Sequence, residues 1–261
     1  MQTGEPGKTV DYGVVSDGHG FEDSPDCERI AGGINSKGPH AVAIGRQANM
    51  LQWGFYASPD RMTDSAKMVF LNALVYMQQF DGHRPLVEKT MSGRTWLRQF
   101  VDSIRGLDPE EDNERRLNYY RGRFPESAIE VAGLDPDALD RWLDANLEYL
   151  YGEGRRGLKL DQDLQQLGLS NRKPEFLDWL HKRLTGHPDD AVARRLARRY
   201  LSEGIGDDPT AALAWLERNR ARLFFSDQGG YRWRVNTIGQ AAPTDASTAA
   251  ETPAATGGTG S

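Results

Sequence analysis

The sequence predicts an α+β protein, in which a small β-sheet with a covering helix precedes a duplicated, mainly helical domain whose copies end in short β-hairpins. Three observations support this prediction: two short apolar runs joined by a polar turn, one long helical pattern after them, and a stretch of sequence that occurs twice in the second half. The chain has 261 residues, of which 38% are hydrophobic. This is ordinary usage for a globular protein, so a core of normal size is expected.

The apolar runs lie near the N-terminus. Residues 40–46 and 50–55 are separated by Gln47-Ala48-Asn49, a length and chemistry typical of a hairpin connection. The glycine-rich residues 32–39 before them are expected to form an exposed connection. Thr63 has the chemistry of an N-cap, and the apolar residues after it recur at helical spacing as far as Met77. Because the opposite side of this helix is apolar too, we expect it to be covered on more than one face.

The repeated sequence is the clearest feature of the second half. Residues 135–146 read DPDALDRWLDAN and residues 208–219 read DPTAALAWLERN, at an offset of 73 that continues without a gap to Gly157 and Gly230. Neighbouring copies of a duplicated unit commonly pack together and bury what one copy leaves exposed. Each copy is therefore expected to consist of three helices and a hairpin.

These patterns divide the chain into three parts. Residues 10–82 contain the strands and the long helix. Residues 83–239 contain the duplicated helical domain, with units at about 88–168 and about 172–239. The last part, residues 240–261, is composed mostly of Ala, Thr, Gly, Pro and Ser and has no aromatic residue, so we expect a disordered tail.

Charge and composition limit the function classes. The net charge of −6 comes from 38 acidic and 32 basic residues, so no broad basic surface is available and a nucleic-acid partner is not expected. No apolar run approaches the ~18 residues that a membrane span needs. The single cysteine, Cys27, excludes an internal disulfide, and residues 1–8 do not resemble a signal peptide, which leaves the compartment open.

One acidic loop contains groups that bind divalent metals. Asp17, His19, Asp23 and Asp26 supply carboxylates and an imidazole within a short stretch. Their spacing matches no established zinc or calcium motif, and a polar loop whose carboxylates cap turns around Pro25 explains the same residues. These four residues are candidate ligands only, and no cofactor is assigned.

The repeated Trp and Asn residues are the other candidates. Trp142 and Trp215 have apolar neighbours at helical spacing, which favours a place in the core. Asn146 and Asn219 each lie four residues after their tryptophan. The favoured interpretation is that their side chains satisfy backbone groups at a helix end, and a shared binding role is the alternative.

The first part also resembles a known family. Residues 41–46, residues 50–55 and Phe70-Leu71-Asn72-Ala73-Leu74 are similar to the closing segment of class I glutamine amidotransferase-like domains, including trehalose-utilisation-type (ThuA-like) domains, over about residues 13–80. That family has His-Pro-Glu where this chain has Ser58-Pro59-Asp60. Because serine cannot replace the imidazole base, the resemblance implies the fold of this segment without a glutaminase site, and no catalytic residue is assigned.

The whole chain is also similar to uncharacterised segments of large, exported bacterial proteins with helical repeats, a likeness carried by residues 20–26 and 224–232. We therefore expect a non-enzymatic structural or interaction module of a larger multidomain bacterial protein, periplasmic or secreted, that binds a protein or glycan partner in the groove between the copies. Two alternatives stay open. One is a truncated or degenerate amidotransferase-like or hydrolase domain that needs a missing N-terminal half, and the other is metal-dependent binding through residues 17–27.

Overall fold

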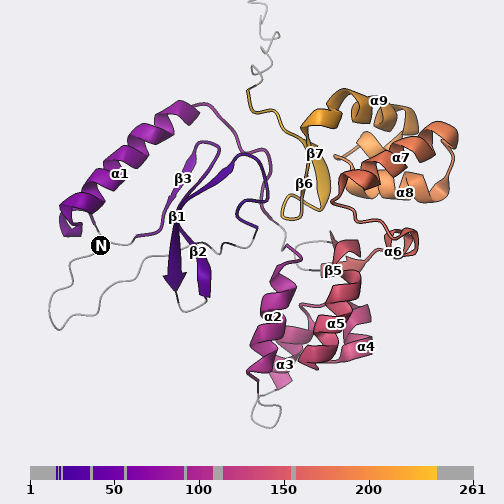
Figure 1. Cartoon of the computed structure of the whole chain (residues 1–261), viewed down its shortest axis with the longest axis horizontal. Helices are drawn as coiled ribbons and strands as arrows, with labels where there is room; N and C mark the ends of the chain where they lie inside the picture. The colour runs from indigo at the N-terminus through magenta and orange to yellow at the C-terminus, as the bar shows by residue number, and fades with distance from the viewer. Residues whose placement is uncertain are drawn as a thin grey trace, which may run out of the picture.

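The computed structural model describes residues 16, 18, 20–35, 38–55, 58–90, 93–107, 114–153 and 157–239. These residues form a mainly helical α+β structure with nine α-helices and antiparallel sheets of three, two and two strands. The predicted fold class is confirmed. Figure 1 shows the hairpin of β6 and β7 near the middle of the molecule, with the three-stranded sheet and α1 on one side and α7, α8 and α9 on the other. The predicted tail, residues 240–261, lies outside the described residues.

The first sheet has the order β1, β2, β3, and its strands are β1 (Cys27–Asn35), β2 (Gly38–Gln47) and β3 (Met50–Trp53). The predicted hairpin is present as β2 and β3. The expectation of an exposed connection at residues 32–39 is wrong, because Gly32 and Gly33 pair with β2 inside the ladder. Glycine contributes no side chain to the alternating pattern that marks a strand, so the sequence carried no signal for the end of β1.

Helix α1 (Asp64–Met77) follows the sheet after the short 3₁₀ helix η1 (Pro59–Arg61), and η2 (Gln78–Phe80) extends it. As predicted, Thr63 is the N-cap, and its side chain accepts a hydrogen bond from the Ala66 N–H. The prediction that the helix is covered on more than one face is wrong. Only Ala66 and Ala73 are buried, whereas large apolar side chains on the opposite side are exposed.

Unit 1 is the first helical unit and has its own core. Its elements are α2 (Trp96–Arg105), α3 (Glu114–Arg121), α4 (Glu126–Ala132), α5 (Pro136–Asn146), η3 (Leu147–Tyr149), β4 (Leu150–Glu153), β5 (Gly157–Leu160) and α6 (Gln162–Leu167). Helices α2 and α5 pack together through Leu97, Val101 and Leu139, which are almost fully buried. Apolar burial of this kind supplies most of the stability of such a unit.

Unit 2 has a second core, formed by Leu180, Leu196 and Leu216 among others. Its elements are α7 (Pro174–Gly186), α8 (Ala191–Tyr200), η4 (Ile205–Asp207), α9 (Pro209–Asn219), η5 (Arg220–Arg222), β6 (Leu223–Ser226) and β7 (Arg232–Val235). The series α9, η5, β6 begins and ends at residues that follow α5, η3, β4 at the same offset of 73 that relates the two sequences. This local structure therefore occurs twice, but the expectation of three helices per copy holds only for unit 2, because α2, α3, α4 and α5 precede the hairpin of unit 1.

A fully buried arginine joins the two units. The Arg94 side chain is 0% exposed, and its Nε and Nη2 donate to the two carboxylate oxygens of Asp227 at 3.0 and 2.9 Å. Its Nη1 donates to the Leu147 carbonyl at the end of α5, and Nη2 also donates to Asn171 Oδ1 before α7. A buried charge is tolerated only when it has a counter-charge and when its N–H groups have hydrogen-bond acceptors. Here three separate segments of the chain supply these acceptors.

Asp227 belongs to the turn that joins β6 and β7, residues 226–230, which we call the central turn. Asp23 accepts hydrogen bonds from the Ser226 hydroxyl and from the backbone N–H groups of Asp227 and Gln228. On the other side a Cβ at Gly229 would lie 2.9 Å from Val87 Cγ1, so only glycine allows residues 84–90 to approach so closely. The central turn thus contacts the N-terminal loop, the segment before α2 and unit 1.

We predict that Arg94→Met lowers the free energy of unfolding by about 3–5 kcal/mol, because it leaves the Asp227 carboxylate buried and unpaired. Arg98→Met, one turn later in α2, is the matched control. Arg98 is 44% exposed and pairs with Asp140 and Asp144 at the surface, so its loss should cost no more than about 1 kcal/mol. Urea denaturation followed by circular dichroism measures both. Equal effects of the two substitutions would show that the buried pair is not a stabilising contact.

The two matched tryptophans should differ in their effect on stability. Trp142 is 9% exposed, whereas Trp215 is only partly buried against the core of unit 2. Trp142→Ala should therefore cost about 3–5 kcal/mol and Trp215→Ala about 1–3 kcal/mol in the same denaturation experiment. A cost for Trp215→Ala as large as that for Trp142→Ala would contradict the difference in burial.

Candidate functional site

The acidic loop is used for structural contacts at the two positions that the structure describes. Asp26 is buried, and its Oδ2 accepts a hydrogen bond from the Leu86 N–H at 2.9 Å, while Asp23 caps the central turn. Burial raises the pKa of Asp23, and the hydrogen bond from Ser226 partly offsets this. Among the described residues no group of three or more His, Cys, Asp or Glu could hold a metal ion. Asp17 and His19 lie outside them, so the four-residue metal site stays a prediction.

Cys27 and Ser58 are the residues that an amidotransferase-like interpretation would place in an active site, and each interacts with a residue close to it in the sequence. Cys27 Sγ lies 3.3 Å from Ser24 Oγ. Ser58 precedes η1, and its hydrogen bond lowers the pKa of Asp60. In the part of the chain that the structure describes, neither Cys27 nor Ser58 forms a hydrogen bond with an imidazole. Neither residue therefore forms the nucleophile–imidazole pair of an amidotransferase within the described residues.

The matched asparagines share one local geometry. In both copies Nδ2 donates to the carbonyl of the tryptophan four residues earlier, at 2.9 Å, which satisfies a backbone acceptor at the helix end. The Oδ1 of Asn146 accepts from Gln165, and the Oδ1 of Asn219 accepts from Arg222. The side-chain amides are therefore engaged inside their own units, which supports the capping interpretation.

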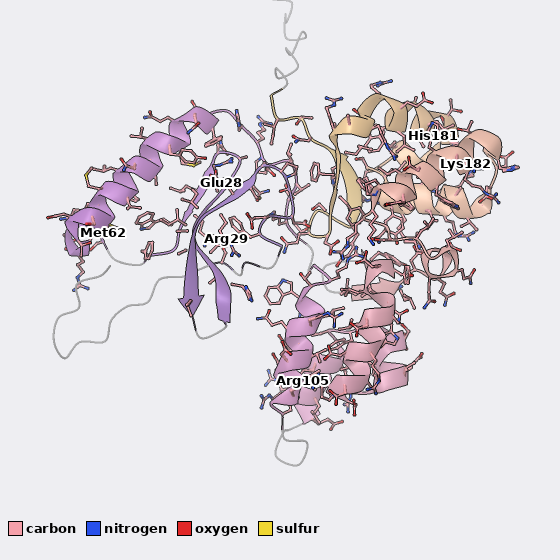
Figure 2. The ribbon with its side chains drawn as sticks, viewed as in Figure 1. Glu28, Arg29, Met62, Arg105, His181 and Lys182 are labelled. Carbon is pink, nitrogen blue, oxygen red and sulfur yellow. The ribbon has the colours of Figure 1, made fainter. Side chains whose placement is uncertain are left out.

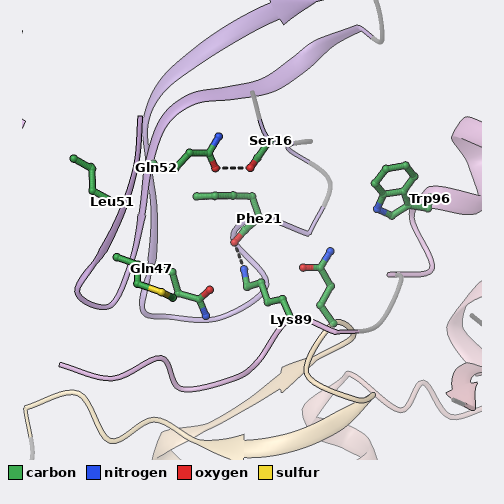
Figure 3. Close-up of a pocket in the computed structure, with 10 residues that line it drawn as sticks. Ser16, Phe21, Gln47, Leu51, Gln52, Lys89 and Trp96 are labelled. Atoms are coloured by element: carbon green, nitrogen blue, oxygen red, sulfur yellow. Dashed lines mark hydrogen bonds between the residues drawn. The ribbon is translucent and has the colours of Figure 1, made fainter. Parts of the chain in front are cut away.

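A pocket of about 400 Å³ lies where the first sheet meets unit 1 and the central turn (Figure 3), and we call it the junction pocket. Its walls come from Ser16 and Phe21, the hairpin of β2 and β3, the segment that leads into α2, and the central turn. Figure 3 shows Trp96 at the start of α2 across the pocket from the strands, with Phe21 between them. The residues that carry its chemistry are Phe21, Gln47, Gln52, Lys89, Trp96 and Gln228.

Successive side chains of β2 point to opposite faces of the sheet, and only one of these faces lines the pocket. Gly45 and Gln47 line it, whereas the Arg46 guanidinium between them lies over the Phe80 ring at the end of η2, 3.7 Å from its centroid. A Cβ at Gly45 would lie 2.4 Å from Phe21 Cζ, so glycine is what allows the Phe21 ring to rest against the strand. The ring therefore forms a fixed apolar wall.

The polar groups of the pocket are almost all uncharged. Gln52 Nε2 donates to the Val42 carbonyl at 3.1 Å, and Gln52 Oε1 accepts from the Ser16 hydroxyl. Gln47 Nε2 donates to the Val87 carbonyl, and its Oε1 accepts no hydrogen bond from any residue that the structure describes. The described residues that line the pocket include no carboxylate. The one charged group, the Lys89 ammonium, donates to the carbonyls of Gly20 and Phe21.

A second candidate surface is an exposed apolar stripe on α1. It consists of Met68, Leu71, Leu74 and Val75, whose exposed fractions are 57%, 54%, 46% and 65%, and we call it the α1 stripe. Residues 68–80 contain no charged side chain. Exposed apolar residues that form one continuous surface indicate an interaction site, whereas scattered ones do not.

The opposite side of α1 fixes the helix on the sheet. The Phe70 ring packs edge-on against Trp53 of β3 at 5.0 Å between centroids. The Tyr76 hydroxyl donates to Glu28 of β1, and this hydrogen bond lowers the pKa of Glu28 and raises that of Tyr76. Figure 2 shows Glu28 on the side of the sheet that faces α1. The stripe is therefore held facing away from the sheet.

The sequence reasoning missed both surfaces. It expected the working surface between the copies, where the structure places the buried Arg94 network. The helical spacing of Met68, Leu71 and Val75 is the sequence signal for the α1 stripe, but the same spacing is equally typical of a buried helix face. The junction pocket gave no local signal, since its walls come from distant segments.

In the described part of the chain, no helix is both long enough and apolar enough to cross a membrane. Comparisons of the chain with protein-family models, with curated proteins and with solved structures find no match. The resemblance of residues 13–80 to amidotransferase-like domains therefore stays a prediction, and the function must be argued from the two surfaces themselves.

Proposed function

We propose that this chain is a non-enzymatic interaction module that pairs with a second copy of itself through the α1 stripe. The observation that carries the proposal is the exposure of four large apolar side chains on one side of a helix whose other side is fixed to the sheet. Burial of such a surface against a partner is favourable, at about 25 cal/mol per Å² of apolar area. The convex shape of a helix suits a macromolecular surface better than a small molecule.

The spacing of the stripe favours a helix as the partner surface. Met68, Leu71 and Val75 follow the alternating spacing of three and four residues that forms the seam of paired helices, with Leu74 flanking it. Side chains at these positions insert between those of a facing helix. A second α1 supplies a matching seam of the same length.

Charge favours a second copy as that partner. Because residues 68–80 carry no charge, a twofold axis can place the stripe against itself without opposing like charges. In an antiparallel pair, the acidic start of one helix at Asp64 would approach the end of the other, which His83 and Arg84 follow. The helix dipoles would also run in opposite directions, which is favourable.

The carboxylates and the thiol that could act in an enzyme are used in structural contacts, which supports the proposal of an interaction module. Asp23 and Asp26 cap backbone N–H groups, and Cys27 lies against Ser24. These contacts give each group a structural role. A binding module is consequently the simpler proposal.

We expect sedimentation velocity to show a monomer–dimer equilibrium that shifts toward the dimer as the protein concentration rises. The double variant Leu71→Glu with Val75→Glu should be monomeric, because the dimer would place four carboxylates in an apolar seam. Both residues are exposed, so the stability of the monomer should change by no more than about 0.5 kcal/mol per site.

The matched control is Leu167→Glu with Val131→Glu, which changes exposed residues of the same types on α6 and α4. This variant should dimerise like the unmodified chain. A chain that stays monomeric at every concentration, or a dimer that survives the α1 substitutions, would refute pairing through the stripe.

A further inference from the structure

We propose that the junction pocket is a binding site for a neutral saccharide. This site is separate from the α1 stripe and does not depend on pairing of the chain. Its volume of about 400 Å³ falls within the range of small-molecule sites, which is ~300–1,000 Å³. Such sites combine apolar or aromatic walls with a few fixed polar groups, and the junction pocket has both.

The aromatic walls suit the apolar face of a sugar ring. Phe21 and Trp96 are both half-buried, so each ring is held by the protein while part of it remains accessible. The axial C–H groups of a pyranose form a flat apolar patch that packs on an aromatic face through dispersion and weak C–H contacts. Figure 3 shows Phe21 next to the strands and Trp96 beyond it at the start of α2, so the lining has an aromatic ring from each of the two parts.

The polar groups suit hydroxyls better than ions. A hydroxyl both donates and accepts a hydrogen bond, and so does a side-chain amide. Gln47, Gln52 and Gln228 supply three amides to the lining. Both ends of the Gln52 amide are already bonded, to the Val42 carbonyl and the Ser16 hydroxyl, so the acceptor left for a sugar hydroxyl is Gln47 Oε1, which has no partner among the described residues. A cationic ligand would find no carboxylate among the described lining residues, and the Lys89 ammonium already donates to two carbonyls, which makes it a poor anion site.

The pocket is held in shape without a ligand. Gln228 belongs to the central turn, where its backbone N–H donates to Asp23 and its carbonyl accepts from the Thr90 N–H. Gln47 Nε2 donates to the Val87 carbonyl at 2.9 Å. Preformed walls reduce the entropy lost on binding, so a small number of contacts can give measurable affinity.

The test is titration calorimetry of the full chain with cello-, malto- and chito-oligosaccharides as neutral probes and an oligogalacturonate as the acidic probe. At least one neutral probe should bind with a dissociation constant below about 1 mM. Trp96→Ala should weaken that binding at least tenfold. Trp96→Phe keeps an aromatic face and should retain most of the affinity, which separates loss of stacking from loss of folding.

Trp179→Ala is the matched control, because Trp179 is also half-buried but lies in α7, away from the pocket. This variant, and the double substitution in the α1 stripe, should bind the saccharide like the unmodified chain. The proposal is overturned if no neutral probe binds the folded protein, if only the acidic probe binds, or if Trp96→Ala binds with unchanged affinity. Failure of dimerisation leaves these expectations intact, so the two proposals are tested separately.

Discussion

The ion pair between Arg94 and Asp227 is the constraint on which the rest of the structure depends. A guanidinium that is withdrawn from water must have a counter-charge and acceptors for its N–H groups, and these come from Asp227, Asn171 and the Leu147 carbonyl. The cores of the two helical units also share residues, since Leu164 of unit 1 packs in the core of unit 2 and Tyr231 packs in the core of unit 1. The polar contact adds a directional constraint where the two units meet. Because Asp227 lies in the central turn, the same contact also determines where that turn can bind the N-terminal loop.

The two candidate surfaces follow from this arrangement. The junction pocket exists because the central turn holds the first sheet close to the start of α2, through Asp23 on one side and through Gly229 against Val87 on the other. The α1 stripe exists because α1 is anchored to the far side of that sheet, where neither unit covers it. The described part of the chain thus has a mainly uncharged pocket where the sheet meets the central turn and an apolar helix surface on α1.

Local patterns in the sequence predicted the elements well. The strands around residues 47–50, the cap at Thr63 and the matched helices that contain Trp142 and Trp215 all depend on neighbours within a few positions, and such signals can be detected in one sequence. The pairing of Arg94 with Asp227 spans 133 residues, and no local pattern indicates it.

Two physical facts limit what the sequence predicts about sites. A carboxylate that could bind a metal ion is equally able to accept hydrogen bonds from backbone amides, and Asp23 and Asp26 do the latter. A helix that is apolar on all sides is commonly buried, so Leu71 and Val75 were expected to be covered, and only the tertiary structure shows them exposed.

Native-state hydrogen exchange tests most directly whether the central turn joins the sheet and both units into one cooperative body. The N–H groups of Leu86, Thr90 and Gln228, which bond across the junction, should open with the same free energy as core amides of the two units. Opening of these three amides at a clearly lower free energy, while both cores stay protected, would show that the junction is a loose contact and would contradict the central claim.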